Sequence, residues 1–481
     1  MENNEDITPE EQMNDAELNR GSAKHQQLLK LFEDNPEAMN AYLILKHTDK
    51  SVFLTGKAGT GKSTFIKLIA SLFQNTYIVA PTGIAANNVD GTTIHSAFHL
   101  PHEFLLPNDP AIYSKYFSQD DKWTIYMTVG LIIIDEISMV NCSMLDSLSN
   151  ILQEITGKDE PFGGKKMLFV GDPFQLPPVL QTKDKKTLNT FYKNEHFFES
   201  EAYAELDPIK IELNISYRQK EEQFLTCLNN IRSYKTLDDS ISLLNKNCYD
   251  NKNTGSIKSD TNSIMLAYYN KSANEINEKK LHTLPGELFT FFSEEKGHFN
   301  WGNVQAERTL ELKVGARIIL TKNVSGYYHN GTLAIVTELS ADKVIVTTDE
   351  GNVLEIEKYE WTNFKKISHK VKKEWISNSV ESGSMKQFPI RLAWAITVHK
   401  SQGLTFDNVY LLNDGYAFAA GQTYVALSRC RSMEGLRFYK RLNKADIVVD
   451  KEILNFYKSV AKEKRIQSVI EGINYDEDLH L

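Results

Sequence analysis

The sequence predicts an α/β protein built on parallel sheets, with a small all-β insertion in its second half. Short apolar stretches such as Ser51 to Thr55 and Leu131 to Asp135 alternate with stretches of helical periodicity. Strands that are apolar on both faces indicate a parallel sheet covered by helices on both sides. Residues 307 to 361 differ, because polar and apolar residues alternate there between turn residues, which is typical of a small barrel or sheet.

The first α/β set begins with a helical pattern at about Gln26. Between its second and third strands, residues 101 to 124 are irregular and aromatic. A stretch of that length indicates an inserted element rather than a bare loop. The four candidate strands of this set are Ser51 to Thr55, Thr76 to Ala80, Leu131 to Asp135 and Lys166 to Asp172.

The second α/β set is interrupted by the β insertion. Its candidate strands are Ile211 to Asn214, Ser263 to Ala267, Ile390 to Thr397 and Asn408 to Leu412. The expected division is therefore a disordered acidic tail (1–25), a first domain (26–205), a second domain in two pieces (206–275 and 384–446), an inserted β module (276–383) and a C-terminal helix with an acidic tail (447–481).

Composition narrows the class of protein. The 481 residues are 41% hydrophobic and 24% charged, and no apolar run reaches membrane-spanning length. The N-terminus lacks the features of a secretion or transit signal, and four cysteines without metal-ligand spacing favour a reduced cytoplasmic protein. A net charge of −9 argues mildly against nucleic-acid binding. Both termini are acidic, however, and a local basic groove would suffice.

A phosphate-binding loop is the strongest single motif. Residues Gly56 to Ser63 match GxxxxGK[ST], between a predicted strand and a predicted helix. Backbone N–H groups of such a loop surround phosphate oxygens, Lys62 reaches the β- and γ-phosphates, and Ser63 ligates Mg²⁺. A glycine-rich turn that binds no nucleotide is the alternative, and the strand-loop-helix context argues against it. The residues expected to contact ATP here are Gly56, Ala58, Gly59, Thr60, Gly61, Lys62, Ser63 and Thr64.

Two further motifs end neighbouring strands, where ligands of parallel sheets bind. Asp135 is expected to hold Mg²⁺, and Glu136 is placed to polarise the attacking water. An acidic pair at a strand end also occurs simply as charge at a helix N-terminus. Gln175 follows the next strand and is suited to touch the γ-phosphate, with a rigid surface turn as the alternative.

The blocks together resemble the signatures of the PIF/RecD-like branch of superfamily 1B DNA helicases. They follow the family's order over roughly residues 36 to 440. The resemblance implies two RecA-like P-loop domains, an aromatic pin or wedge at 101–124 and an SH3-like inserted module. The matching blocks are Pro81 to Ala86, Gly91 to Phe98, Asp135 to Met139, Pro161 to Gly164, Gln175 to Pro178, Leu392 to Gly403 and Gly421 to Arg429.

The resemblance also assigns site residues. Arg218 and Arg429 look like the two arginines that reach across the inter-domain cleft and stabilise the transition state, and Gln402 and Gly403 look like nucleotide-contacting positions. Tyr268 and Tyr269 suit base stacking or the core equally well. The run Lys365 to Lys373 could track phosphates or be a solvated face. The positions that resemble DNA-facing ones are Thr82, Thr93, His95, Phe98, Pro177, Asn270, His399, Lys400 and Ser401.

The activity implied is an ATP- and Mg²⁺-dependent helicase that moves 5′→3′ on single-stranded DNA. It would act as a monomer on forked or structured DNA in replication, repair or recombination, in the cytoplasm near the nucleoid. The alternatives are an RNA or RNA–DNA hybrid helicase of a neighbouring branch, an ATPase acting on other molecules, and a non-enzymatic DNA-binding protein.

The sequence departs from the family pattern at two places, one of which bears on the choice of nucleotide base. Met39 and Asn40 stand near the place where the family has a Gln that reads adenine. The stretch from Asn141 to Gly157 is poorer in Arg than the family signature. Since a thioether is a poor hydrogen-bond partner, weak discrimination between ATP and GTP is expected.

Overall fold

The computed structural model describes most of residues 35–473, and the account below concerns those residues. The positions outside the description within that span are 74, 99, 101–103, 108–122, 220, 250–262, 300, 302–305, 323, 325–326, 329–330 and 372–373, and the side chains of 87, 123–125, 363–371 and 374–382.

The first domain is built on a six-stranded parallel sheet. Its strand order is β3-β2-β4-β5-β1-β6, so the strand that leads into the phosphate loop lies between two others. Central strands are buried along their whole length, as their continuous apolar sequences predict. The strands are β1 (Val52–Gly56), β2 (Thr76–Ala80), β3 (Thr92–Thr93), β4 (Leu131–Ile134), β5 (Lys166–Val170) and β6 (Ile209–Leu213).

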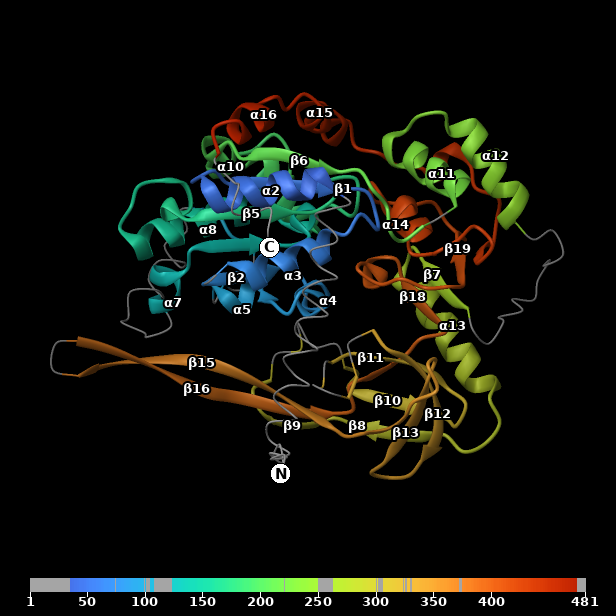
Figure 1. The fold of residues 1–481 in the computed structure, drawn as a ribbon. Helices are drawn as coiled ribbons and strands as arrows, with labels where there is room; N and C mark the ends of the chain where they lie inside the picture. The colour runs from blue at the N-terminus through green and yellow to red at the C-terminus, as the bar shows by residue number, and fades with distance from the viewer. Residues whose placement is uncertain are drawn as a thin grey trace, which may run out of the picture.

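Helices cover both faces of this sheet (Figure 1). Side chains alternate between the faces, so Phe53 joins one core while Val52 and Leu54 join the other. The helices α2 (Pro36–His47), α3 (Lys62–Leu72) and α16 (Arg465–Ile470) pack on the face of Val52. The other face carries α7 (Trp123–Thr128), α8 (Cys142–Thr156), α10 (Glu201–Leu206) and α15 (Lys451–Val460).

The last strand of the first sheet corrects the predicted domain border. The segment expected to start the second domain forms β6 instead, and β6 pairs in parallel with β1. Its apolar residues Ile211 and Leu213 are buried against α2 and α3. The first domain therefore extends past residue 205, and it also takes up α15 and α16 from the C-terminal stretch. A strand apolar on alternate positions carries no signal of which sheet it joins.

The second domain has a four-stranded parallel sheet in the order β18-β7-β19-β20. Helices α11 and α12 lie on one side of it with the first domain nearby, and α13 lies toward the β module (Figure 1). The strands are β7 (Ile264–Ala267), β18 (Ala395–Thr397), β19 (Val409–Leu412) and β20 (Leu436–Phe438), and the helices are α11 (Glu222–Ser233), α12 (Leu237–Cys248), α13 (Asn270–Thr283) and α14 (Gln422–Ser428).

The inserted module is all β, as predicted, but its borders lie later than expected. Helix α13 packs on β7 and β18 of the second domain. The predicted strand Ile390 to Thr397 is split, because β17 (Ile390–Leu392) pairs with β11 of the module whereas β18 pairs with β7. The other strands are β8 (Phe289–Phe292), β9 (Glu294–Gly297), β10 (Thr309–Leu312), β11 (Arg317–Leu320), β12 (Leu333–Leu339), β13 (Val344–Thr348) and β14 (Val353–Ile356).

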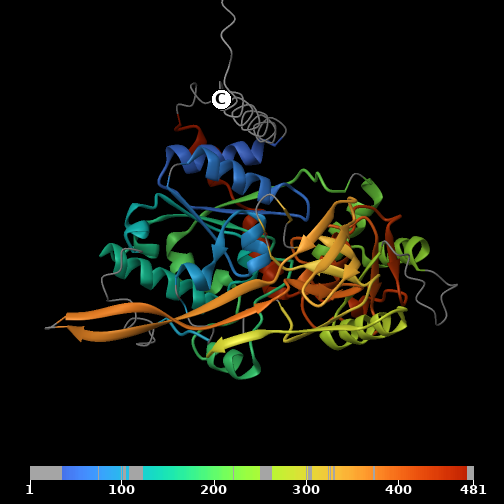
Figure 2. The same ribbon diagram turned by 90° about the horizontal axis from the view of Figure 1, so that it is seen from below.

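A long antiparallel hairpin extends from the module beneath the first domain (Figures 1 and 2). It consists of β15 (Tyr359–Val371) and β16 (Glu374–Gln387), which pair along most of their length. Most of the basic run Lys365 to Lys373 lies on β15, and its side chains lie outside the described residues.

The remaining helices are short. They are α4 (Gly83–Asn88), α5 (Ile94–Ala97), α9 (Thr182–Leu188), and the 3₁₀ turns η1 (Ile137–Met139), η2 (Pro161–Gly164), η3 (Phe197–Glu199), η4 (His399–Ser401) and η5 (Lys444–Asp446).

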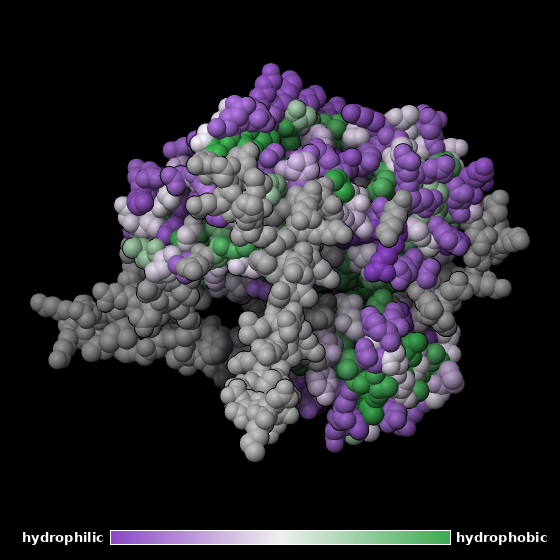
Figure 3. All heavy atoms as spheres, in the orientation of Figure 1, coloured by the Kyte–Doolittle hydropathy of each residue, from purple (hydrophilic) through white to green (hydrophobic). Residues whose placement is uncertain are grey.

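The surface is mixed, with hydrophilic side chains dominating the two α/β domains in Figure 3 and apolar ones gathering over the β module. The module exposes Phe292, Val314 and Val353. No helix among the described residues is long and apolar enough to cross a membrane. All four cysteines are buried as free thiols.

Candidate nucleotide and nucleic-acid sites

The phosphate loop has the backbone geometry of an anion site. Gly59 and Gly61 have φ of +77° and +84°, a conformation that favours glycine. No side chain caps the N-terminus of α3, so its first N–H groups are left for an anion. A Cβ on Gly59 would lie 2.3 Å from Cβ of Arg218, so glycine is also required by this close approach.

Lys62 is held over its own loop. Its Nζ donates to the carbonyl oxygens of Gly56 at 2.7 Å and Lys57 at 3.0 Å. Burial lowers the pKa of Lys62, while the charges of Asp172 and Glu136 raise it. The ammonium is therefore positioned before any phosphate arrives, which reduces the ordering cost of binding.

A cavity of ≈ 210 Å³ opens in front of this loop, between the two domains. Most of the predicted nucleotide residues line it, together with groups from the second domain. The lining residues are Ala58, Gly59, Thr60, Gly61, Lys62, Ser63, Thr64, Glu136, Gln175, Arg218, Gly403 and Arg429. The motifs predicted separately from the sequence thus converge on one space.

The acidic pair lies at the carboxyl end of β4. Asp135 is buried, and its Oδ1 accepts from the backbone N–H of Glu136 at 2.9 Å. Burial and the neighbouring charge of Glu136 raise the pKa of Asp135 to about 8. Glu136 adopts the left-handed region with φ of +49°, and its Oε2 accepts from Nε2 of Gln402 at 3.1 Å. Gln402 comes from the second domain, so the position of that domain bears directly on Glu136.

The oxygen donors of Asp135 and Ser63 fit a hard divalent cation. Asp135 is a buried carboxylate for which the structure records no ion pair, and such a charge is costly unless a cation compensates it. The described residues contain no group of three or more His, Cys, Asp or Glu side chains that could hold a metal. A cation here would need phosphate oxygens as further ligands, which is usual for Mg²⁺ beside a nucleotide.

Arg429 is an almost fully buried guanidinium, 2% exposed. It donates to neutral acceptors, namely Val425 O at 3.1 Å, Leu404 O at 3.2 Å and Ser428 Oγ at 3.0 Å. Burial and the nearby charge of Arg218 lower its pKa to about 9. A buried cation without a directly bonded carboxylate, beside a phosphate loop, is arranged to meet an incoming anion.

Arg218 differs from its predicted placement. It follows β6, on the segment that leaves the first domain, and the N–H of Tyr217 donates to Gly59 O at 2.8 Å. Its own Nη1 donates to Ser428 O at 3.3 Å. Arg218 therefore lies on the first domain's side and reaches toward the second, whereas only Arg429 approaches from the second domain.

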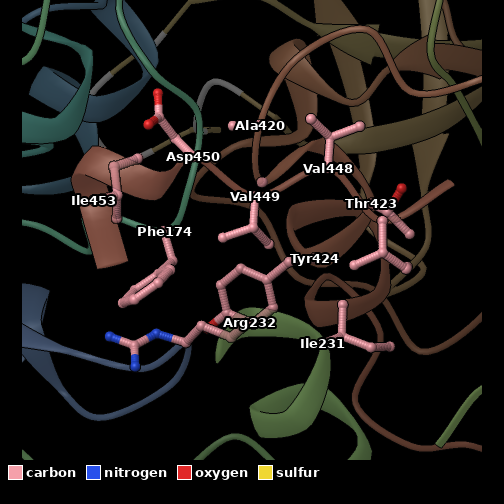
Figure 4. A pocket seen from close by; sticks show the side chains of 12 residues that line it. Phe174, Ile231, Arg232, Ala420, Thr423, Tyr424, Val448, Val449, Asp450 and Ile453 are labelled. Carbon is pink, nitrogen blue, oxygen red and sulfur yellow. The ribbon is translucent and has the colours of Figure 1, made fainter. Parts of the chain in front are cut away.

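A buried cluster that the sequence analysis did not single out joins the two domains. The hydroxyl of Tyr424 accepts from the N–H of Ala58 at 3.0 Å and donates to Asp172 Oδ2 at 3.1 Å. Arg232 pairs with Asp172, its Nε lying 3.1 Å from Oδ1. Its guanidinium lies 4.4 Å from the ring centroid of Phe174. Figure 4 shows Arg232 beneath Phe174 and beside Tyr424, and the adjoining cavity measures only ≈ 10 Å³.

This cluster also corrects one nucleotide prediction. Since the N–H of Ala58 is directed at Tyr424, it is not a free donor for phosphate. Tyr424 lies inside a matched block, so its chemistry was visible in the sequence. Its partners, however, are separated from it by 366 and 252 positions, and no local pattern predicts such pairings.

The predicted DNA-facing residues of the first domain divide into two groups. Thr82 and Thr93 are half-buried and accept from backbone N–H groups of the short helices that follow them. His95 and Pro177 are half-buried as well. Phe98 is a correction, because it is 1% exposed and packs on Tyr126 with ring centroids 5.0 Å apart, so it has no face free for a base.

The second domain presents a cluster of aromatic rings, made by Tyr269, His399 and Phe418, with the exposed Tyr416 beside them in the chain. The ring of Phe418 is 58% exposed and lies 5.7 Å from that of His399 and 5.3 Å from that of Tyr269. The hydroxyl of Tyr269 donates to Tyr416 O at 2.8 Å. Phe418 and Tyr416 were missed, although their place just before a matched block was a usable signal.

Other predictions around this aromatic cluster have mixed outcomes. Asn270 and Lys400 directly follow Tyr269 and His399 in the chain, and both residues are exposed overall. Partial desolvation of the Lys400 ammonium and the charge of Arg391 lower its pKa to about 8. Ser401 is a correction, because it is fully buried and its hydroxyl donates to Val398 O at 2.8 Å. Tyr268 is buried in the core and bonds Thr423, so only Tyr269 keeps an exposed ring.

Within the predicted pin, the structure describes residues 104–107 and the backbone of residues 123–124, which begin α7. Leu105 is buried, and the carbonyl oxygen of Pro107 accepts from Asn150 Nδ2 at 3.0 Å. Residues 104–107 are therefore anchored on α8. The aromatic residues Tyr113, Tyr116 and Phe117 lie outside the described residues.

Comparison with known proteins decides the family. A family model described as PIF1-like helicase matches residues 33–246. The ATP-dependent DNA helicase Pif1 of Campylobacter jejuni is 31% identical over 85% of this chain and 94% of its own length. The chain belongs to the PIF1-like helicases. Zebrafish (Danio rerio) PIF1 is also 31% identical, but the match covers 65% of it, so the chain spans less than two thirds of that PIF1-like relative.

Solved PIF1-like structures agree in fold. The Bacteroides Pif1 helicase in complex with ADP-AlF3 and ssDNA is 35% identical, with a TM-score of 0.72 over 89% of this chain and 97% of that chain. The Candida albicans Pif1 helicase is 28% identical with a TM-score of 0.70. The predicted family and the predicted parallel-sheet α/β fold of RecA-like type are therefore confirmed.

Proposed function

We propose that this chain is an ATP-driven helicase that moves along single-stranded DNA and separates duplex or structured DNA. The observation that carries the proposal is the cavity shared by the two domains. A complete phosphate loop lines one side of it and the buried cation of Arg429 lines the other. ATP hydrolysis in such a site depends on the relative position of the two domains. A motor requires this coupling between hydrolysis and domain arrangement.

The proposed chemistry assigns a role to each group in the cavity. Lys62 binds the β- and γ-phosphates, and Arg429 and Arg218 stabilise the negative charge that develops during phosphoryl transfer. Glu136 orients the attacking water and accepts its proton, and Gln175 contacts the γ-phosphate. Asp135 and Ser63 would hold Mg²⁺, which supplies charge neutralisation when bound. Gln402 holds the carboxylate of Glu136 through the bond between the domains.

Movement along DNA follows from the same contacts. Nucleotide binding favours the closed arrangement because it adds contacts to both domains, and product release removes that preference. The first domain would bind the DNA strand near Thr93 and His95, and the second domain would bind it near His399 and Phe418. The two domains then bind the strand tightly in alternation. A 5′→3′ direction and the strand-splitting role of residues 101–124 belong to this proposal.

The nucleic-acid partner is proposed to be single-stranded DNA with a fork or other structure. Bacteroides Pif1 has been solved bound to ssDNA, and another structure concerns two coordinating Pif1 helicases at forked dsDNA. We expect one copy to suffice for translocation, and unwinding assays across protein concentrations test whether a second copy adds activity. Replication, repair and recombination in the cytoplasm are the proposed setting.

The decisive experiment measures ATP turnover and unwinding together. Turnover is compared without nucleic acid, with single-stranded DNA and with single-stranded RNA of the same sequence. Unwinding is measured on forks that carry only a 5′ tail or only a 3′ tail. Stimulation by DNA above RNA, with unwinding of the 5′-tailed fork, is expected. Equal or greater stimulation by RNA would move the assignment to an RNA helicase, and no stimulation would contradict a nucleic-acid motor.

A further inference from the structure

The start of helix α14 lies close against the first domain at one point and bonds to it at another. Gly421, which precedes the helix, has φ of +73°, and a Cβ there would lie 2.2 Å from Phe174 O. Three residues later, the hydroxyl of Tyr424 binds both Ala58 N and Asp172 Oδ2. The oxygen of Tyr424 thus has one donor and one acceptor, both from the first domain, at ordinary hydrogen-bond distances.

The surroundings of Tyr424 keep this arrangement rigid. Tyr424 is 3% exposed and Asp172 is fully buried. The charge of Asp172 is balanced by Arg232 of α11, and the guanidinium of Arg232 contacts the rings of both Phe174 and Tyr457, 4.4 and 4.8 Å from their centroids. The hydroxyl of Tyr424 and Nε of Arg232 both bond the carboxylate of Asp172, and such a shared buried acceptor favours a single geometry.

Arg429 follows α14 directly and has no comparable anchor on the first domain. Its hydrogen bonds go to Val425, Leu404 and Ser428, which all belong to the second domain. The place of its guanidinium relative to the phosphate loop therefore depends on where α14 sits. The bond from Ala58 to Tyr424 connects that helix to the phosphate loop itself.

We propose that Tyr424 is a positioning residue, which sets the distance between Arg429 and the phosphate loop by holding Ala58 and Asp172. This inference rests on the proposed ATPase function and goes beyond it. Tyr424 touches no reacting atom in this role. It acts through Arg429, since a displacement of about 1 Å of a catalytic group costs on the order of 10²-fold in rate.

The test compares Tyr424→Phe in two backgrounds. In the otherwise native protein we expect kcat with saturating single-stranded DNA to fall about 10- to 100-fold, with KM for ATP changed less than about threefold. In the Arg429→Ala background the same substitution should lower kcat less than about twofold, because the group that it positions is gone. Equal factors in both backgrounds would overturn the inference, as would an Arg429→Ala variant with nearly native turnover.

A matched control separates positioning from lost stability. Tyr268→Phe also removes a buried hydroxyl, which bonds Thr423 Oγ1 at 2.8 Å within the second domain. It should lower Tm about as much as Tyr424→Phe and leave kcat within about twofold. If both variants lower kcat alike, the role of Tyr424 is only structural.

A second measurement covers the case in which Tyr424→Phe has a low Tm. The kcat comparisons in both backgrounds are then repeated at a temperature well below that Tm, where the variant is folded. The loss should persist in the otherwise native protein and again vanish in the Arg429→Ala background; a loss present in both backgrounds overturns the inference. Failure of the proposed function would look different, since the native protein itself would then show no turnover stimulated by DNA.

Discussion

The first domain's side of the nucleotide cavity comes mainly from one continuous loop, whereas the second domain's side comes from segments brought together by folding. Gly56 to Ser63 carry their geometry in their own sequence. Arg429 and Gln402 acquire theirs from α14 and the turn η4. The first side takes its backbone geometry from its own residues, with one added bond from Ala58 to Tyr424, whereas the second side depends on how the domains are arranged. Binding of nucleotide and its hydrolysis should therefore fail separately when the two sides are altered.

The largest effect is expected at the first side. Lys62→Ala should lower turnover and unwinding by about 10³-fold or more, because the loop loses the cation that meets the phosphates. Turnover is measured with saturating single-stranded DNA, and circular dichroism checks the fold. Near-native turnover in the folded variant would remove Lys62 from the site.

A substitution on the second domain's side of the cavity should leave nucleotide affinity nearly unchanged and lower the rate of ATP hydrolysis. Arg429→Ala should retain most affinity for a fluorescent ADP while kcat falls about 10³-fold, the scale of an arginine finger. Arg429→Lys should recover little, because an ammonium cannot reproduce the planar fork of donors. A fall of less than about tenfold would make Arg429 a structural residue. If the affinity for ADP fell by the same factor as kcat, the two sides of the cavity would not differ in function.

The inserted aromatic segment allows ATP turnover and strand separation to be compared as separate activities. Replacing residues 108–120 with a Gly/Ser linker keeps the anchors at Leu105 and Pro107. We expect turnover stimulated by DNA to stay within about twofold and unwinding of a forked duplex to fall about tenfold or more, because only strand separation needs the segment. Unchanged unwinding would count against a pin in this region.

The aromatic cluster of the second domain should contribute to DNA affinity. Phe418→Ala should weaken binding of a labelled oligo-dT by about 5- to 100-fold, since a stacked base is worth about 1–3 kcal/mol. Fluorescence anisotropy at fixed salt gives the affinity. Phe191→Ala is the matched control, because Phe191 is 66% exposed on the first domain. Equal behaviour of the two variants would leave no stacking role for Phe418.

The smallest expected effect concerns the base of the nucleotide. Met39 is partly buried and packs against the core beneath α2, so its side chain is committed to packing. We therefore expect GTP to support turnover at a kcat/KM within about tenfold of ATP, because phosphate contacts do not distinguish the bases. A preference for ATP above about a hundredfold, near 2.7 kcal/mol, would show that another group reads adenine.

Local features were predictable from the sequence, and features that depend on distant pairing were not. The phosphate loop and the acidic pair carry their signals in consecutive residues. The sheet joined by β6 and the split of Ile390 to Thr397 between two sheets depend on partners far along the chain. Periodicity reports burial but not the identity of the neighbour.

The candidate site shows the same limit. The matched blocks identified Arg429 and Gln402 but placed Phe98 and Ser401 on the DNA-facing surface, where the fold buries them. A block marks a stretch of chain, whereas a short helix directs neighbouring residues to opposite sides. The contacts of Tyr424 with Ala58 and Asp172 could not be read from spacing at all.

The chain passes between the two α/β domains twice, once after β6 and once before α15. The first passage is the segment around Arg218, and the second is Val448 to Asp450. A body attached to another at two points turns most easily about the line that joins them. Two covalent connections therefore favour rotation of the second domain about the line that joins them over sliding along the first domain. Each cycle of nucleotide binding and release would then follow one angular coordinate, so every step along a strand should have the same length.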